Sequence, residues 1–499
     1  MLYQSTRGGQ NGLNSADVIK MGIAKDGGLF VPEKGIKLSL EDINKLTGMT
    51  YQERAVEILK YFLDDYTAEE LKDCVTQAYT SSKFDTAAIA PLRVLNENVH
   101  ILELWHGPTC AFKDMALQIL PHFLIKAMGK TGESSEIVIL VATSGDTGKA
   151  ALEGFKDVNG TRIIVFFPQK GVSQVQKMQM VTQEGSNVYS IGVDGNFDDT
   201  QNGVKAIFTD SELISELEQN QIKFSSANSI NWGRLVPQIV YYFSAYADLI
   251  KKGEINAGDA VNFVVPTGNF GNILAAYYAI EMGLPVNKLI CASNDNNVLT
   301  DFIKTGTYDR NREFKKTISP SMDILISSNL ERLLYELTEH DSDRINDWMS
   351  KLKKEGVYTV DAETKKKISK LFWAGYSTEA ETLKTIELIY KEYGYVSDTH
   401  TAVGIDVYDK YVISTGDMTK TVIASTASPF KFNESVVKAI FGSDTISGKS
   451  EFELLEILSQ KCGLNIPKGL KDLDKKDIRH NMLCTKSDMK DKVVEILGI

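Results

Sequence analysis

The sequence lacks the cysteine and histidine spacing that metal sites and disulfide frameworks need. Its five cysteines are scattered without a C-x-x-C pair, and its six histidines form no H-x-x-x-H pattern. These absences argue against a zinc site and against a disulfide-stapled secreted fold, so we expect no metal and a reducing compartment. The cysteines are Cys74, Cys110, Cys291, Cys462 and Cys484.

Long hydrophobic runs and an excess of positive charge are also missing. No stretch of about 18 apolar residues occurs, and the N-terminal MLYQSTRGGQNG has no apolar core of the kind a secretory leader carries. The formal net charge of −11 argues against nucleic acid and anionic membranes as partners. We therefore expect a cytoplasmic protein, in which a local cationic cleft could still bind an anionic small molecule.

Strand and helix patterns alternate along most of the chain. Its 499 residues suggest roughly two to four domains. Residues 1–95 are mainly helical in pattern, and from residue 97 onward short β-branched runs alternate with helical ones. Such alternation is typical of parallel sheets covered by helices. The runs are IVILVA (137–142), RIIVFF (162–167), NVYSIGV (187–193), VNFVVP (261–266), KLICAS (288–293) and KTVIAS (420–425).

A long helix predicted over residues 231–253 separates two groups of these runs. The separation predicts an α/β fold with two lobes, and a cleft between lobes is a usual ligand site. Charged helical patterns over 310–395 and 444–499 look peripheral to that cleft. The domains we expect are a mainly helical N-terminal domain (1–95), a first lobe (96–235), a second lobe (236–443) and a helical C-terminal tail (444–499).

Lys113 stands in ELWHGPTCAFKDMALQ (103–118), after a turn and at the start of a predicted helix. A solvated lysine at a helix start is one interpretation. The other is a desolvated amine that does chemistry, because burial and a helix N-terminus would both lower its pKa, as a Schiff-base lysine requires.

The first glycine-rich loop, VATSGDTGKAAL (141–152), follows a strand and opens a helix that we expect to begin near Lys149. Its backbone N–H groups, its small hydroxyls and the helix dipole could bind a carboxylate or a phosphate. It is not a Walker A loop, because Ala150 replaces the residue that would meet magnesium, and it is not G-x-G-x-x-G. An ordinary tight turn between strand and helix is the alternative.

The second loop, VVPTGNFGNILAAYYA (264–279), lies between a buried strand and an apolar helix. Gly268 and Gly271 let the backbone approach a ligand closely, and the helix N-terminus points at it. A phosphate cup and a plain turn are both compatible with this pattern. Two such loops with a lysine between them suit a phosphorylated cofactor, a carboxylate-bearing substrate and a reactive amine.

These segments together resemble the motifs of threonine synthases of the long bacterial and fungal type. HGPTCAFKDMALQ, ATSGDTGKAAL and PTGNFGNILAAYYA carry the resemblance, which runs in order and spacing to about residue 440. Further matching segments are YQSTRG (3–8), DGGLFVP (26–32), NSINWGRLVPQIVYY (228–242), ISPSMDILISSNLERLL (318–334), THTAVG (399–404) and STASPFKF (425–432).

The resemblance implies a two-lobed fold like the tryptophan synthase β chain, which is pyridoxal-phosphate fold type II. It implies pyridoxal 5′-phosphate bound to Lys113, which is also the catalytic base, and Thr426 facing the pyridine nitrogen. The cofactor-phosphate cup then consists of Gly268, Asn269, Phe270, Gly271 and Asn272. The substrate residues implied are Thr143, Ser144, Gly145, Asp146 and Thr147 for the α-carboxylate, with Asn231 and Arg234 near the mouth.

The implied reaction converts O-phospho-L-homoserine and water to L-threonine and phosphate, in a monomer or homodimer. Lys149, Arg234 and Lys431 are candidate ligands of the substrate phosphate, and each is equally readable as a surface charge. One departure occurs at Ser428, where the family pattern has histidine. His400 or His106 could replace that histidine only if the fold brings either of them near.

Three alternatives remain open at this point. A dehydratase or a sulfhydrylase of the same fold would share the lysine and both loops. A phospho-lyase that stops after elimination is kept open by Ser428, and a silent cofactor-binding homologue is a different class of protein. The long helical N-terminal region and the motif TSGDTGKAAL favour a threonine synthase over these alternatives.

Overall fold

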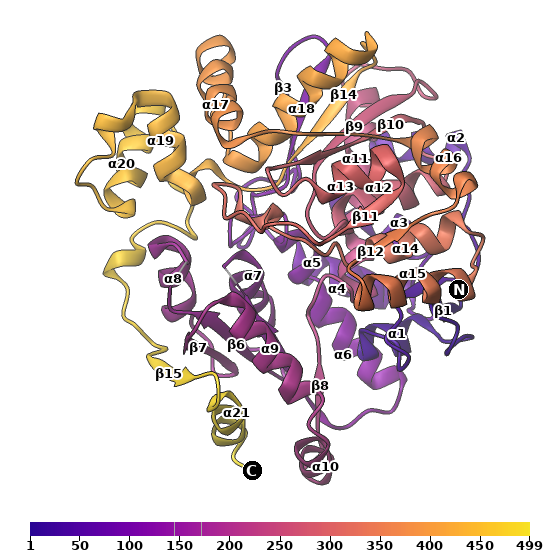
Figure 1. The fold of residues 1–499 in the computed structure, drawn as a ribbon, viewed down its shortest axis with the longest axis vertical. Coiled ribbons are helices and arrows are strands. Elements are labelled where there is room, and N and C mark those ends of the chain that lie inside the picture. Colours follow the sequence, from indigo (N-terminus) through magenta and orange to yellow (C-terminus); the bar gives the residue numbers. More distant parts are fainter. Residues whose placement is uncertain (144, 171) are drawn as a thin grey trace.

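The computed structural model describes residues 1–143, 145–170 and 172–499, and two sheets organise the chain (Figure 1). The larger sheet has the order β13-β10-β9-β14-β4-β3 and is parallel except for the β3–β4 pair. Its strands are β3 (Leu92–Val94), β4 (Val99–Glu103), β9 (Val261–Pro266), β10 (Val286–Ser293), β13 (Phe372–Tyr376) and β14 (Thr421–Ser425). The predicted two-lobed α/β fold with parallel sheets is confirmed.

The smaller sheet is parallel throughout and has the order β15-β7-β6-β5-β8. It contains β5 (Glu136–Ala142), β6 (Thr161–Pro168), β7 (Val188–Asp194), β8 (Ile222–Ser225) and β15 (Met482–Thr485). Two antiparallel pairs complete the strands: β1 (Tyr3–Ser5) with β2 (Phe30–Pro32), and β11 (Thr307–Asp309) with β12 (Val357–Thr359).

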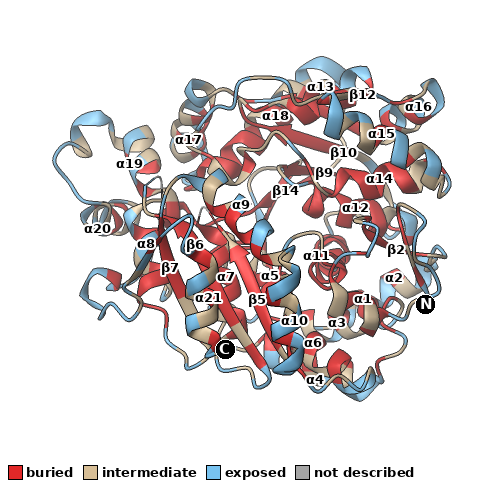
Figure 2. Cartoon of the chain, turned by 60° about the horizontal axis from the view of Figure 1, so that its bottom comes forward, coloured by how far each residue is buried: buried red, intermediate tan, exposed pale blue. Residues whose placement is uncertain are grey.

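The central strands are apolar on both faces because helices cover both sides of each sheet. Every residue of β9 and β14 is buried, and Figure 2 shows the strands of both sheets buried beneath half-exposed helices. Continuous apolar runs are what parallel sheets of this kind require. The helices that precede β5 in the sequence are α1 (Ser15–Met21), α2 (Leu40–Lys45), α3 (Tyr51–Leu59), α4 (Ala68–Ala78), α5 (Asp114–Leu117) and α6 (Leu120–Lys130).

Capping residues set several helix starts. Thr50 before α3 and Thr67 before α4 each form a reciprocal capping box with a glutamate three residues later, which satisfies free backbone N–H groups. The helices that flank the smaller sheet are α7 (Asp146–Phe155), α8 (Gln174–Val181), α9 (Phe197–Phe208), α10 (Ser211–Gln219) and, near the C-terminus, α21 (Met489–Leu497). Helix α7 begins at Asp146, three residues before the predicted start at Lys149.

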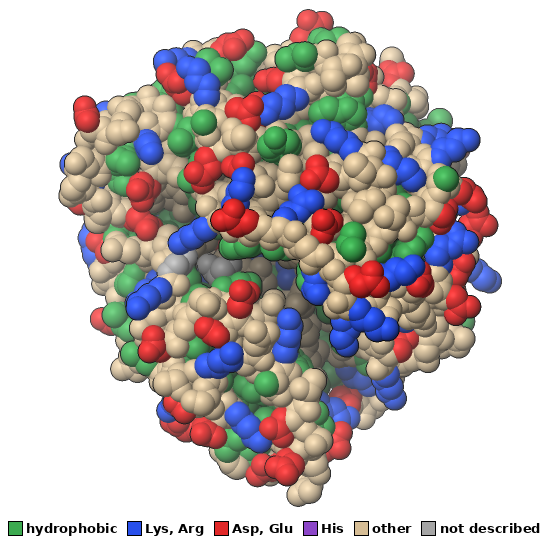
Figure 3. Space-filling model, viewed as in Figure 1, with side chains coloured by type: hydrophobic (Ala, Val, Ile, Leu, Met, Phe, Trp, Pro, Cys, Tyr) green, Lys and Arg blue, Asp and Glu red, His purple; other side chains and the backbone are tan. Residues whose placement is uncertain are grey.

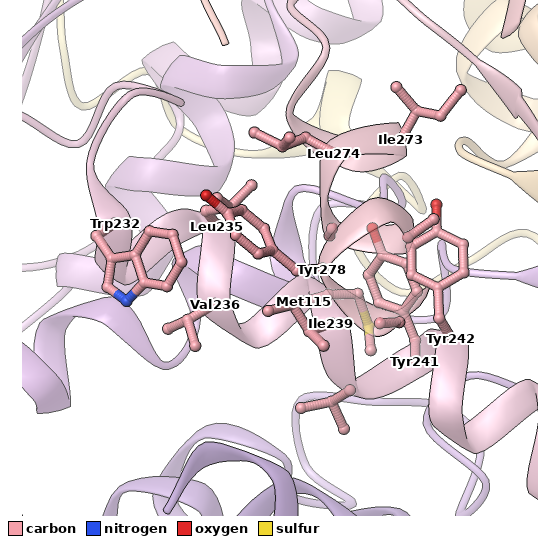
Figure 4. Close-up of a cluster of buried hydrophobic side chains, with 14 of the residues drawn as sticks. Met115, Trp232, Leu235, Val236, Ile239, Tyr241, Tyr242, Ile273, Leu274 and Tyr278 are labelled. Carbon is pink, nitrogen blue, oxygen red and sulfur yellow. The ribbon is translucent and has the colours of Figure 1, made fainter. Parts of the chain in front are cut away.

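The long helix α11 (Trp232–Lys251) lies at the centre of the core and confirms the helix predicted over 231–253. Its apolar face contacts α12 (Gly271–Glu281) and α5, and Figure 4 shows Trp232, Ile239 and Tyr242 among their partners. Met115, two residues after Lys113, belongs to the same cluster. The core therefore holds the Lys113 segment and the loop before α12 on one rigid support.

The remaining helices complete the larger lobe and the C-terminal region. They are α13 (Val298–Thr305), α14 (Leu330–Leu337), α15 (Ser342–Lys354), α16 (Ala362–Leu371), α17 (Glu379–Tyr393), α18 (Thr399–Thr415), α19 (Asn433–Phe441) and α20 (Glu451–Cys462). Figure 3 shows one face of the molecule, with acidic and basic side chains interspersed and a hollow near its middle.

Strand pairing connects segments that the predicted domains separate. β4 lies in the range predicted for the first lobe yet pairs with β14, and β15 in the predicted tail pairs with β7. The four domain ranges stay predictions. Within the described residues, no helix is both long and apolar enough to cross a membrane, and no group of His, Cys, Asp and Glu side chains could hold a metal ion.

Candidate active site

The Lys113 ammonium group is held by polar groups from both halves of the chain. Its Nζ donates to Ser321 Oγ at 3.1 Å and lies 3.4 Å from Asp146 Oδ2. Burial lowers the pKa of Lys113, and the positive charges of Lys431 and Arg234 lower it further, while Asp146 acts in the opposite direction. The site therefore favours the neutral amine more than water does.

A short backbone bridge joins the Lys113 segment to the segment around Thr426. Phe112 N donates to Thr426 O at 2.8 Å, and Ser428 N donates to Cys110 O at 3.0 Å. The turn before Lys113 is fixed as well, because the Asp114 carboxylate accepts from the backbone N–H and the hydroxyl of Thr109. These bonds set the position of Thr426 relative to Lys113.

Asp146, the first residue of α7, forms the centre of a buried charge network. Its Oδ1 accepts from Lys431 Nζ at 2.7 Å and from Gln176 Nε2 at 2.9 Å. Burial alone would raise the pKa of Asp146, but Lys431 and Lys113 outweigh it and hold the pKa far below its usual range. Lys431 has no exposed surface and also donates to the carbonyl of Thr109 at 3.0 Å.

The loop before α7 is built around Thr143 and Gly145. Thr143 Oγ1 accepts from the backbone N–H of Gly145 and of Gly148, both at 3.0 Å. Gly145 has φ of 152°, and a Cβ there would lie 2.6 Å from Gln176 Nε2, so the position requires glycine. Thr147 is half-buried in the first turn of α7, and Ser144 lies outside the described residues.

The loop from Gly268 to Asn272 forms a cup at the start of α12. Its carbonyl groups are bound from behind, since Ser327 Oγ donates to Gly268 O at 2.7 Å and Asn329 donates twice to Asn269 O. Phe270, with φ of 64°, turns the chain into the helix in a left-handed conformation. The backbone N–H groups at the start of α12 are therefore available on the other side.

Asn272 supplies a further donor to this cup. Its Oδ1 accepts from the hydroxyls of Tyr241 and Tyr242 at 2.6 and 2.5 Å, which fixes the orientation of the amide. Its Nδ2 is buried and has no hydrogen-bond partner among the described residues. A buried free donor beside a helix N-terminus fits a phosphate group, so this cup fits the 5′-phosphate of a pyridoxal cofactor.

Arg234 is a buried cation near Lys113. Its Nη1 donates to Ala227 O at 2.9 Å, while Nε has no hydrogen-bond partner in the described part of the chain. Burial lowers its pKa to about 10, and no carboxylate contributes to the shift. A buried charge without a counterion is costly, which favours an anionic ligand at this position.

The other cations considered for the substrate phosphate have partners of their own. Lys149 pairs with Glu153 at 3.2 Å and also contacts Gln183, and Lys431 pairs with Asp146. Asn231 caps α11: its Oδ1 accepts from Gly233 N, and its Nδ2 donates to the carbonyls of Ile19 and Ser226. The Asn231 side chain therefore supports the start of the helix, and its position near the mouth of the site stays a prediction.

His400, unlike His106, reaches the Lys113 environment. Its Nε2 accepts from the backbone N–H of Ser321 at 3.1 Å, and its Nδ1 bonds with Asp398 at 3.0 Å. Because a backbone N–H can only donate, Nε2 carries no proton and Nδ1 is the donor. His106 instead bonds with Asp85 and Glu103.

Ser428 is fully buried and occupies a structural position. Its hydroxyl accepts from Phe430 N, and its own N–H donates to Cys110 O in the bridge beside Lys113. Sequence patterns did not reveal Ser321 or Gln176, which touch Lys113 or Asp146 from other elements. The only signal for Ser321 was its place in the segment ISPSMDILISSNLERLL, which matched the family without a stated role.

Three family models match consecutive parts of the chain. "Threonine synthase N terminus" matches residues 2–79, "Pyridoxal-phosphate dependent enzyme" matches 87–362, and "Threonine synthase, C-terminal" matches 401–490.

Individual relatives agree with these family models. The threonine synthase of Pseudomonas aeruginosa is 40% identical over 89% of this chain and 91% of its own length. Threonine synthase-like 1 of Homo sapiens is 43% identical over 85% of this chain, which spans 58% of that relative's length. The structure of a pyridoxal-phosphate-bound threonine synthase from Brucella melitensis superposes with a TM-score of 0.88 at 37% identity, and 99% of each chain is covered.

Proposed function

Because the chain belongs to the threonine synthase family, we propose that it converts O-phospho-L-homoserine and water to L-threonine and phosphate. Pyridoxal 5′-phosphate is the cofactor in this proposal. The observation that carries it is the position of the Lys113 amine, which is half-buried and held at the charge network of Asp146, while a phosphate-fitting cup occupies the start of α12.

Three groups of this chain would hold the cofactor. The cup at Gly268 to Asn272 would bind its phosphate through backbone N–H groups and Asn272 Nδ2, Lys113 would bind its aldehyde carbon, and Thr426 would face the ring nitrogen. When bound, the cofactor supplies an electron sink for negative charge at the substrate's Cα. The bridge from Phe112 to Thr426 keeps the last two of these groups at a fixed separation.

Lys113 then acts as the base that moves protons. Its lowered pKa leaves more neutral amine, which would take a proton first from Cα and then from Cβ, so that the electron pair left at Cβ expels the phosphate from Cγ. Return of a proton to Cγ and addition of water at Cβ then give threonine. Ser321 Oγ and Asp146 Oδ2 hold the amine between transfers. His400 positions Ser321 through its backbone N–H, so it acts through Ser321 rather than on the substrate.

The substrate's two anionic groups would occupy different positions. Its α-carboxylate would lie at the loop Thr143 to Thr147, where the N-terminus of α7 supplies backbone N–H groups. Its phosphate would lie at Arg234, a buried cation near Lys113 that has no carboxylate partner among the described residues. Lys149 and Lys431 are already neutralised, which makes them weaker candidates.

Replacing Arg234 with glutamine is expected to raise KM for O-phospho-L-homoserine by about 10- to 100-fold, because a charge-assisted hydrogen bond is lost. The thermal midpoint of the free enzyme should stay the same or rise, since an unpaired buried charge is removed. Steady-state kinetics and a melting curve measure the two effects. Arg162→Gln, which breaks an ion pair with Glu136 on β5 and β6, is the matched control and should leave KM unchanged. An unchanged KM in Arg234→Gln would contradict this assignment.

Measuring phosphate release and threonine formation together tests the proposed reaction. We expect equal amounts of both products from O-phospho-L-homoserine, and a yellow protein that loses its colour when the cofactor is removed. Phosphate without threonine would identify a lyase that stops at elimination. Turnover of serine or threonine without phosphate release would favour a dehydratase. A colourless protein with full activity would contradict the cofactor assignment.

The cytoplasmic location and the monomeric or homodimeric state stay predictions. All five cysteines are free, which supports a reducing compartment. Size-exclusion chromatography with light scattering would determine the oligomeric state.

A further inference from the structure

A second polar cavity lies outside the Lys113 site. Its volume is about 220 Å³, and its walls come from five segments: the turn after α4, the His106 to Pro108 turn, α7 with Lys156 at its end, residues 182–184 after α8, and residues 467–476. None of Lys113, Asp146, Arg234 and the cup residues lines it. Five lysines do: Lys83, Lys149, Lys156, Lys468 and Lys476.

The acidic residues of this cavity are each paired with a cation of the same wall. The pairs are Asp85 with His106 at 2.5 Å, Glu153 with Lys149 at 3.2 Å and Glu184 with Lys156 at 3.1 Å. Asp85 and Glu103 outweigh the effect of burial and raise the pKa of His106 to about 9, so it is charged at neutral pH. The wall therefore keeps an excess of positive charge, although the whole chain carries −11.

The excess charge belongs to Lys83, Lys468 and Lys476. Within the described residues, none of the three has an ion pair or a hydrogen bond through its Nζ, while Lys468 and Lys476 remain exposed on the outer side. Lys83 is half-buried, and burial lowers its pKa, which shows how little water stabilises its charge. Three lysines around one open cavity have no carboxylate partner among the described residues, and an anion of matching size would supply the counterion.

We propose that this cavity binds a small phosphorylated metabolite. Lysine ammonium groups bind phosphate oxygens as point charges, and three of them suit a group with two or more negative charges. The volume lies below the roughly 300–1,000 Å³ of sites for drug-sized ligands, which favours a small phosphorylated molecule over a nucleotide. The phosphoryl group lies among Lys83, Lys468 and Lys476, and its binding joins residues 467–476 to the turn after α4.

Isothermal titration of the full chain with pyrophosphate tests the proposal. The protein is first saturated with pyridoxal 5′-phosphate so that the cofactor cup is filled, and the buffer holds little salt. The variant Lys83→Gln, Lys468→Gln, Lys476→Gln should weaken pyrophosphate binding by about tenfold or more, because its three charged contacts are lost. The control variant Lys34→Gln, Lys366→Gln, Lys449→Gln removes the same charge from exposed lysines outside the cavity and should change binding less than about twofold.

Each outcome decides the proposal. Undetectable binding to the wild-type chain, or equal losses in both triple variants, would overturn it, and so would unchanged binding in the cavity variant, which would place pyrophosphate at the Lys113 site. A parallel titration with citrate separates phosphoryl from carboxylate ligands, and binding of citrate alone would also overturn it. If the triple variant does not fold, two other measurements give the same decision. Lys83→Gln alone should weaken pyrophosphate binding, and pyrophosphate should protect Lys83 of the wild-type chain from acetylation. No readout depends on catalytic activity, so failure here leaves the proposed reaction untouched.

Discussion

Replacing Lys113 with alanine is expected to lower kcat for threonine formation by about four orders of magnitude. The variant loses both the amine that binds the cofactor and the base that moves protons at Cα, Cβ and Cγ. No neighbour can replace it, because the Lys431 ammonium is fully buried and bound to Asp146 and to the Thr109 carbonyl. Borohydride should fix the cofactor covalently to the wild-type chain and not to the variant, as mass spectrometry would show.

The fold of Lys113→Ala should survive, which makes the loss of activity interpretable. Asp146 keeps Lys431 as its counterion at 2.7 Å, and the repulsion that Lys113 receives from Lys431 and Arg234 disappears. The melting temperature should therefore stay close to that of the wild type, and added ethylamine should restore part of the activity. Lys126→Ala, which breaks an ion pair with Asp73 on the outside of the molecule, is the control and should keep full activity. A Lys113→Ala enzyme with more than about a tenth of the wild-type kcat would contradict the role of Lys113.

Local sequence patterns predicted the strands because burial on both faces leaves a continuous apolar run. VNFVVP at 261–266 is β9 residue for residue, and IVILVA at 137–142 is β5 without its first residue. The start of α7 was predicted too late because Gly145, its N-cap residue, has no side chain to signal the helix start. β15 was missed because it is a four-residue edge strand with only one buried residue, inside a charged segment.

The partners of Lys113 could not be predicted in the same way. Lys431 meets Asp146, and Ser321 meets Lys113, across 285 and 208 residues of sequence, which only the packing of the two sheets brings together. Local periodicity carries no information on such contacts. One signal was available and unused: Glu153 follows Lys149 by four residues on α7, which predicts the ion pair that removes Lys149 from the substrate-phosphate candidates.

Replacing Asp146 with asparagine is expected to lower the free energy of unfolding by about 3–5 kcal/mol, because it leaves the Lys431 ammonium buried without a counterion. Lys431→Met should lower the free energy of unfolding by less, because the Asp146 carboxylate still has Lys113 at 3.4 Å and Gln176 at 2.9 Å as partners. The loss of unfolding free energy in the double variant should be clearly smaller than the sum of the losses in the two single variants, as expected for a buried pair whose partners are removed together. Urea unfolding of the wild type, the two single variants and the double variant gives the coupling energy between Asp146 and Lys431. The exposed pair Lys486–Asp199 is the control, and a double-mutant cycle on this pair should give a coupling energy of at most about 1 kcal/mol.

The acid dependence of this penalty gives a second, independent check. Lys431 and Lys113 hold the folded-state pKa of Asp146 far below the ordinary value of an aspartate. A lowered folded pKa contributes stability that is fully present above the unfolded value and is lost as pH falls below it. The difference in stability between wild type and Asp146→Asn should therefore be constant from neutral pH to about pH 5 and shrink below about pH 4. Asp146→Asn should also lower the pKa of the Lys113 amine further, because the carboxylate that raises it is gone. The amine is free only once substrate has displaced it from the cofactor, so the acidic limb of the kcat profile should shift to lower pH. A penalty that does not change between pH 7 and pH 3, or an acidic limb that moves to higher pH, would contradict the network of Asp146, Lys431 and Lys113.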